Sequence, residues 1–345
     1  MTQNTYYSPR LIIKNTECTS GMSGSISFPG NNQANILKIN INDPGFQHAR
    51  LFNEELIFYL NYGSDDSVPF FRGFIKNIAP TDTGVSITAI DGRSFINSKD
   101  SKMVELTDHE NYDGFTLAAF LHDYINTNIN INNKTYIGLD GLRDTYPSIS
   151  MSGVRSKPSP AYTLITNELK KAIDDSDVEK PLNYFIDMVE DGNKSNITFV
   201  KQKQLTTAPS LYLSFSDGIL SYKYKRRAPA NYATGGGSKF TYGSGPLGTI
   251  GMSVEGDFKD KNEARQELIK KVLLQYHESD EITLECTKGH DIGLGSIVRL
   301  NIEEEDIDDN HRVTSKNIKF GPQGVKFSLS LNKKPIILSD YIHAH

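Results

Sequence analysis

Short segments that alternate apolar and polar residues dominate both ends of the chain. Near the start, residues 56–62, 70–78 and 85–90 are rich in β-branched and aromatic side chains, and turn-forming residues separate them. A period of two is typical of strands that bury one face. Short strands with a turn every eight to twelve residues or so favour a small barrel or sandwich.

The same pattern returns near the end of the chain at a fixed offset of 240. Residues 57–85 align without a gap to residues 297–325, and ten of these 29 positions are identical, against about one in fifteen to twenty by chance. The identical pairs are Ile57/Ile297, Leu60/Leu300, Asn61/Asn301, Asp66/Asp306, Arg72/Arg312, Lys76/Lys316, Asn77/Asn317, Ile78/Ile318, Gly84/Gly324 and Val85/Val325. We therefore expect two copies of one small β-barrel, with Arg72 and Arg312 at corresponding sites.

The middle of the chain has a different period. Residues 113–126 place Phe115, Ala118, Leu121, His122 and Ile125 on one helical face, with Asp113 as the expected N-cap. A second helix is expected to begin at the Ser-Pro step of residues 159–160, and residues 183–189 and 197–201 form a predicted hairpin. This part is therefore predicted to be an α/β insert.

The complete prediction is a mainly β fold with an α/β insert and two similar small β-barrels. The first barrel covers residues 1–97, the insert 98–205 and the second barrel 206–345, which includes a helix at about 260–277 capped by Asp260. A glycine-rich segment at residues 232–251 lacks the spacing of a phosphate-binding loop and is interpreted as a flexible connector or a bulged strand.

Composition restricts the possible functions. The 345 residues are 37% hydrophobic and 23% charged, the net charge is -5, and no run of about 18 apolar residues could span a membrane. An acidic chain argues against specific nucleic-acid binding, which requires a basic face. Cys18 and Cys286 lack zinc or redox spacing. The first ten residues contain no apolar run of a secretory signal, so assembly in the cytoplasm of the host cell is expected.

The chemistry-bearing residues match no catalytic signature. His277, His290 and His311 each lie near an acidic residue, but none has the spacing of a metal or acid/base motif. The acidic run 303–309 could hold calcium, yet it lacks the alternating ligands and central glycine of an EF-hand loop, which favours a solvated hairpin tip. The sequence therefore predicts no catalytic, cofactor-binding or metal residue, and no enzymatic activity.

The order of barrel, insert and second barrel resembles a known family. Residues 289–298 (GHDIGLGSIV) contain a Gly-x-Ile step, residues 312–315 (RVTS) an Arg-Val-x-Ser strand, and residues 324–329 (GVKFSL) a strand after a glycine turn. These patterns, over about residues 10–335, are similar to those of the hub proteins of contractile phage tails. That family includes late-control tail proteins, hub chains of prophage-like particles and the amino-terminal part of type VI secretion spikes.

The resemblance implies a structural role. Hubs of this kind are homotrimers whose six barrels form a ring between a six-fold tail tube protein and a three-fold spike protein, with baseplate wedge or tape-measure proteins nearby. The expected location is the tail or baseplate of a virion, without membrane binding of its own. The alternative is a glycan-binding or cell-wall-degrading tail component with the insert as its active domain. Contractile and non-contractile tails, of phages or phage-derived particles, remain open.

Overall fold

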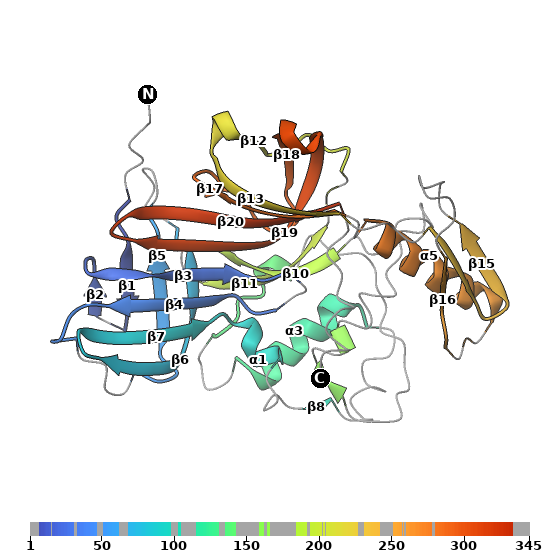
Figure 1. Ribbon diagram of the computed structural model, residues 1–345. Helices are drawn as coiled ribbons and strands as arrows, with labels where there is room; N and C mark the ends of the chain where they lie inside the picture. The colour runs from blue at the N-terminus through green and yellow to red at the C-terminus, as the bar shows by residue number, and fades with distance from the viewer. Residues whose placement is uncertain are drawn as a thin grey trace.

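The computed structural model gives a mainly β protein with a small α/β part (Figure 1). The structure describes residues 7–14, 16–30, 33–46, 51–61, 68–97, 103–104, 115–130, 135–142, 159–161, 164–165, 184–191, 194–201, 203, 205–226, 231–241, 251–256, 258, 260–277 and 280–333.

The first β unit contains seven strands. They are β1 (Arg10–Ile13), β2 (Thr16–Cys18), β3 (Met22–Phe28), β4 (Ile36–Ile41), β5 (Glu55–Tyr59), β6 (Phe71–Thr81) and β7 (Gly84–Ile90). Their order in the sheet is β3-β4-β7-β6-β5-β1-β2. Every second residue of β7 is buried, namely Val85, Ile87 and Ala89. The alternation in the sequence therefore corresponds to one face packed on a core.

The second β unit repeats this order. It consists of β12 (Leu211–Ser214), β13 (Ile219–Arg226), β17 (Asp280–Cys286), β18 (Ile297–Ile302), β19 (Ile307–Gly321) and β20 (Gly324–Asn332). The order is β13-β17-β20-β19-β18-β12, which matches β3-β4-β7-β6-β5-β1 strand by strand. One difference is that β12 runs parallel to β18, whereas β1 runs antiparallel to β5.

The two units share one sheet and one core. Strand β19 pairs with β3, with Ile318 opposite Ile26, and this joins all thirteen strands into a single curled sheet. Figure 1 shows the blue strands of the first unit alongside the red strands β19 and β20. The rings of Phe58 and Phe320, one from each unit, stack with centroids 4.8 Å apart. Buried side chains from both units form one continuous cluster.

The insert packs around its own core. Its described elements are α1 (Arg93–Asn97), β8 (Met103–Val104), α3 (Leu117–Asn128), η1 (Asp140–Leu142), β9 (Ser159–Pro160), β10 (Tyr184–Glu190) and β11 (Ser195–Lys201). Strands β10 and β11 form the predicted hairpin. Ser159–Pro160 forms a short strand with β8, so the predicted helix start at this step is wrong. Ala161, Leu164 and Ile165 are helical and buried, which places helical residues directly after it.

Two details of the helix prediction are wrong. The N-cap of α3 is Thr116, whose hydroxyl accepts a hydrogen bond from the backbone N–H of Ala119 at 3.2 Å, while Asp113 lies outside the described residues. Ala118, Leu121 and Ile125 are buried as predicted, but His122 is exposed and Phe115, which precedes the helix, is 42% exposed. The buried stripe also includes Phe120 and Tyr124.

A small satellite lies apart from the sheet in Figure 1. It consists of β14 (Tyr232–Gly235), β15 (Ser238–Thr241), β16 (Gly251–Ser253) and α5 (Lys261–His277), the helix expected at 260–277. Residues 232–241 of the glycine-rich segment form a regular hairpin, so the interpretation as a flexible connector or a bulged strand is wrong for this part. Gly236 and Gly237 both adopt the positive φ that its turn requires. Among the described helices, none combines the length and apolar content needed to cross a membrane.

Candidate assembly surface and insert junction

The repeated meander has the same register in both copies. Ile57 lies opposite Arg72 in the β5–β6 pair, and Ile297 lies opposite Arg312 in the β18–β19 pair. The hairpins that follow close at Thr81 with Gly84 and at Gly321 with Gly324. Each position in the second copy is the first-copy number plus 240. The predicted repeat is therefore confirmed in strand order and in register.

The bulge that curls each long strand has a different position in the two copies. The register of β6 on β7 shifts between Ile75 and Asn77, which makes Lys76 the extra residue. The register of β19 on β20 shifts between Val313 and Ser315, so Thr314 is extra there. A bulge bends and twists its strand locally, so the two copies curve at different points.

The two repeat arginines occupy corresponding positions with different partners. Arg72 lies 3.1 Å from Oε1 of Glu55 and 3.5 Å from Oε2 of Glu190, which belongs to the insert. Arg312 donates to the carbonyls of Lys203, at 2.9 Å, and Lys333, at 3.3 Å, and burial lowers its pKa to about 10. Arg72 thus contacts a carboxylate of the insert, whereas Arg312 bonds neutral backbone carbonyls in the segments that precede β12 and follow β20.

The two repeat lysines, Lys76 on β6 and Lys316 on β19, differ in burial because only the edge of β19 is paired with another described strand. Lys316 is 5% exposed, and its ammonium donates to the carbonyls of His290, at 2.8 Å, and Ile292, at 2.7 Å. Burial lowers the pKa of Lys316 to about 8. Lys76 is only partly buried and donates to Asn53 Oδ1 at 3.4 Å. Lys316 lies on the part of β19 that β3 covers, and no described strand covers β6 at Lys76.

A buried ion cluster joins the first unit to the insert. Arg93 is 2% exposed, and its Nη2 lies 2.8 Å from Oδ2 of Asp91 and its Nη1 3.6 Å from Oδ1 of Asp187 on β10. Arg93 also donates to the carbonyl of Ile186 at 3.2 Å. Asp91 in turn accepts hydrogen bonds from the backbone N–H groups of Asn35 and Arg93. Each buried charge therefore has partners, as burial demands.

A cavity of about 550 Å³ lies where the insert hairpin meets both units. Its lining includes Phe28, Phe70, Asp187, Glu190, His290 and Lys316. Burial is the main reason that the pKa of Glu190 rises to about 7, although its hydrogen bond from the Ser195 hydroxyl and the Arg72 charge act in the opposite direction. Burial likewise raises the pKa of Asp187.

The pKa of Glu190 predicts a pH-dependent stability. Since the folded state holds this proton up to about pH 7 and the unfolded state releases it near 4.5, the folded state binds more protons in that window and loses stability as pH rises through it. Glu190→Gln should remove this loss, so the variant should gain about 2 to 3 kcal/mol over wild type between pH 4.5 and 8. Thermal unfolding of both proteins at the two pH values measures it. A constant difference would contradict the shifted pKa.

The histidines from the sequence analysis lie in separate places. His290 lies 2.7 Å from the carboxylate of Asp291 and stacks near Phe70, with ring centroids 5.5 Å apart. His311 is 1% exposed, and its Nδ1 lies 3.1 Å from the backbone carbonyl of Asp309. His277 ends α5, and its side chain lies outside the described part of the structure. Within the described residues, no group of three His, Cys, Asp or Glu side chains could hold a metal ion.

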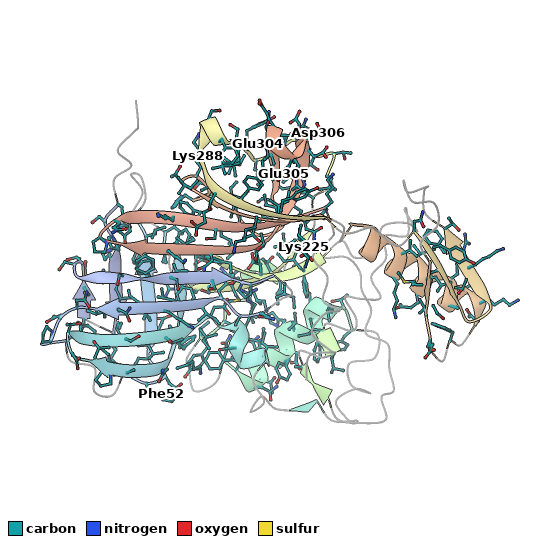
Figure 2. The ribbon with its side chains drawn as sticks, viewed as in Figure 1. Phe52, Lys225, Lys288, Glu304, Glu305 and Asp306 are labelled. Atoms are coloured by element: carbon teal, nitrogen blue, oxygen red, sulfur yellow. The ribbon has the colours of Figure 1, made fainter. Side chains whose placement is uncertain are left out.

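The acidic run forms the tip between β18 and β19. Glu303–Glu305 make a single 3-10 turn (η3), and Figure 2 shows Glu304, Glu305 and Asp306 gathered at this tip. Arg299 bonds Asp308 at 2.9 Å, Lys333 bonds Asp309 at 2.9 Å, and Glu305 accepts from the Tyr222 hydroxyl at 3.0 Å. The carboxylates therefore have cationic and hydroxyl partners rather than a shared centre.

Replacing Glu304 and Glu305 by alanine should change the free energy of unfolding by no more than about 0.5 kcal/mol, because Glu304 is exposed and the Tyr222 hydroxyl, which loses the partly buried Glu305 as its acceptor, can bond to water instead. Calcium chloride should leave the melting temperature of the wild-type protein unchanged. A calcium-dependent rise of several degrees that the double variant loses would identify a metal site instead.

Comparison with known proteins shows a likeness in structure alone. No protein-family model matches the sequence, and no curated protein matches it. A tail protein from Neisseria meningitidis MC58 superposes with a TM-score of 0.66 at 14% identity, covering 97% of this chain and 98% of that one. The 43 kDa tail protein of prophage MuSo2 from Shewanella oneidensis gives 0.63 at 10% identity, with 94% and 97% covered.

A third similar structure comes from a secretion system. The E. coli c3393 protein, a component of the type VI secretion system with structural similarity to the T4 bacteriophage tail proteins gp27 and gp5, gives a TM-score of 0.55 at 8% identity. The match covers 93% of this chain and 76% of that one. The chain therefore has the fold of phage tail proteins over nearly its whole length, as the resemblance in its sequence implied.

Proposed function

We propose that this protein is the structural hub of a phage or phage-like tail, acting as a homotrimeric ring. The observation that carries the proposal is the repeat, in which two units have one strand order and one register in a single chain. Three chains supply six similar units and three inserts. Such a ring matches a six-fold partner through its repeats and a three-fold partner through its inserts.

The partners follow from this symmetry. The six repeated units bind a six-fold tail tube protein, and the opposite face of the ring binds a three-fold spike protein, with baseplate wedge or tape-measure proteins alongside. The protein acts within the tail or baseplate of the virion. The tail-protein fold along nearly the whole chain supports this assignment. Each stable contact should bury upwards of about 1,000 Å².

The proposed role is not enzymatic. Lys316 donates to two backbone carbonyls, and Arg93 lies near two carboxylates. These interactions support a role for both residues in folding and in the junction between insert and barrels.

One observation favours a second candidate, a cell-wall-degrading component with the insert as active domain. Asp187 and Glu190 both lie on β10 and line the cavity, and the pKa of Glu190 is raised to about 7. Glycosidases use two carboxylates, one of which is kept protonated. The ion contacts of Asp187 with Arg93 and of Glu190 with Arg72 favour a structural role for this pair.

A hydrolysis assay separates the two candidates. The purified chain is incubated with peptidoglycan sacculi, and released muropeptides are measured for wild type and Glu190→Gln. The hub role predicts no release from either protein and ring-shaped particles in negative stain. Release by wild type that Glu190→Gln abolishes would overturn the hub role in favour of the enzyme.

A further inference from the structure

Several strand edges have no strand partner among the described residues, among them the outer edges of β2 and β12. Two others, one in each unit, are equivalent to the two edges that join β19 to β3 within the chain. In the first unit this is the edge of β6 over residues 76–80, since β5 covers only the part of β6 from Phe71 to Phe74. In the second unit it is the outer edge of β13, the last strand of the sheet. An unpaired edge presents backbone donors and acceptors to any strand of matching register.

The chain contains a template for closing these edges. In the second unit, the equivalent edge of β19 is covered by β3 of the first unit, with Asn317 opposite Ser27 and Ile318 opposite Ile26. The β6 residues at these positions are Asn77 and Ile78, by the offset of 240. The strand that would cover them must therefore be the second-unit counterpart of β3.

Strand β13 is that counterpart, and register fixes which residues correspond. In the first unit, Ile26 lies opposite Leu37, which lies opposite Ala89. In the second unit, Tyr222 lies opposite Leu284, which lies opposite Leu329. Leu329 is the repeat equivalent of Ala89, because the two positions differ by the offset of 240. Tyr222 therefore corresponds to Ile26, and Lys223 to Ser27.

We propose that β13 of one copy of this chain pairs antiparallel with β6 of the next copy. This interface rests on the proposed ring. Its register places Tyr222 opposite Ile78, Lys223 opposite Asn77, and Ser221 opposite Ala79. The ring seam between copies thus repeats the β3–β19 junction that the chain forms within itself.

Burial of the matching side chains supports this seam. Ile26 and Ile318 are both 0% exposed because their strands pair within the chain. Ile78 and Tyr222 are only partly buried, although both pack on the same core as their counterparts. Pairing of β13 with β6 would bring these two side chains together and complete their burial as in the internal junction.

The ends of the seam also coincide. Pro80 lacks a backbone N–H, so β6 loses a donor at this position. The register of β13 on β17 shifts between Ile219 and Ser221, which makes Leu220 a bulged residue. The proposed register brings Leu220 level with Pro80. Regular strand pairing would therefore end at the same position on β6 and on β13, at Pro80 and Leu220.

The seam is heterologous, because each copy gives one β13 edge and accepts at one β6 edge. A contact of this kind closes into a ring when the rotation per copy fits a whole number. In a closed ring of three copies, every β13 edge is paired with a β6 edge of the next copy, so none of these six edges stays open. The occupant of the β6 edge is therefore a second copy of this chain.

A designed disulfide tests the pairing. Residues that flank a two-residue turn exchange hydrogen bonds, so in β6 the backbone of Ile78 points outward and Asn77 falls in a non-hydrogen-bonded pair, with Cα atoms about 4.5 Å apart. That distance permits a disulfide. Asn77 and Lys223 are both exposed, so Asn77→Cys with Lys223→Cys should fold normally. Cys18→Ser serves as the background, and the buried Cys286 is kept.

The expected result on non-reducing gels, alone and with the spike chain of the same tail, is a ladder that ends at a covalent trimer. Asn77→Cys with Lys225→Cys is the register control, because that pair is two residues out of step and should cross-link at least about tenfold more slowly, as its separation exceeds the disulfide range. Faster cross-linking through Lys225→Cys, or a ladder extending past three, would overturn the seam or its closure.

A charge pair gives an independent readout. Ala79 and Ser221 are exposed and would lie directly opposite each other. Ala79→Glu with Ser221→Glu should raise the concentration at which the trimer dissociates by about tenfold, and Ala79→Lys with Ser221→Glu should restore it. Equal dissociation of the two variants would overturn the seam.

The outcomes separate this inference from the proposed function. A trimer in mass photometry that neither cross-links at Asn77 and Lys223 nor responds to the charge pair refutes the seam and leaves the hub standing. A chain that stays monomeric with its spike refutes the hub itself.

Discussion

Asp91→Ala is expected to lower the free energy of unfolding by about 3 to 5 kcal/mol, because it removes a carboxylate that lies 2.8 Å from the buried guanidinium of Arg93. Arg93 is 2% exposed, and its distance to Asp91 is 2.8 Å but to Asp187 is 3.6 Å. The substitution also removes the acceptor for two backbone N–H groups, those of Asn35 and Arg93. Urea unfolding followed by circular dichroism measures the loss.

An exposed ion pair supplies the matched control. Asp140 lies 2.6 Å from Lys194, but the two side chains are 61% and 38% exposed. Asp140→Ala should therefore lower stability by less than about 1 kcal/mol. The double variant Asp91→Ala, Arg93→Met should recover part of the loss, since it removes the stranded charge. A loss in Asp91→Ala no larger than in Asp140→Ala would show that Arg93 is not buried as described.

Gly84→Ala and Gly324→Ala form a second comparison, at matched positions of the two repeats. A Cβ on Gly84 would lie 1.9 Å from the carbonyl oxygen of Ile41 and 2.8 Å from the backbone N of Asp43. A Cβ on Gly324 would meet no atom within 4 Å, so only its positive φ of 96° opposes the change. We expect a loss of about 3 kcal/mol or more for Gly84→Ala, and about 1 to 2 for Gly324→Ala.

The measurement is the same urea unfolding, with the gap between the two glycine variants as the readout. The contrast arises because Gly84 of the β6–β7 turn lies against the end of β4, whereas the space beside Gly324 in the β19–β20 turn is open. Equal losses would mean that the two hairpin ends have the same surroundings, contrary to the structure.

The sequence predicted the strands of both meanders, because each needs only alternation and a local turn. The offset of 240 then predicted that equivalent residues pair in the two copies. In the structure, Arg72 lies opposite Ile57 on β5, and Arg312 lies opposite the equivalent Ile297 on β18. Local signals of this kind survive folding, since tertiary packing reinforces them.

The joining of the units could not be predicted from the sequence. The pairing of β3 with β19 brings together residues nearly 300 positions apart, and no local pattern marks Ile26 as the partner of Ile318. The burial of Lys316 follows from that pairing, because β3 and the carbonyls of His290 and Ile292 enclose its side chain. From the sequence alone, a lysine in a strand is expected to be exposed.

The helix face was predicted only in part, since Ala118, Leu121 and Ile125 are buried as expected. His122 fits the apolar spacing of α3 but points outward, while Phe120 and Tyr124 are buried. A helical period identifies a stripe only to within about one residue in each turn, and the neighbouring hairpin decides which residues it covers. The raised pKa of Glu190 was also not predictable, because it results from burial where the insert packs against the barrels and no sequence motif indicates that packing.

The copy number of this chain in its assembly tests the hub most directly. Mass photometry of the purified chain with its spike partner should show a species that contains three copies, each of 38.5 kDa, and a cryo-EM map of the tail should show three chains forming six similar units around the axis. One copy, or six, at that position would contradict the link between the internal repeat and the symmetry of the tail.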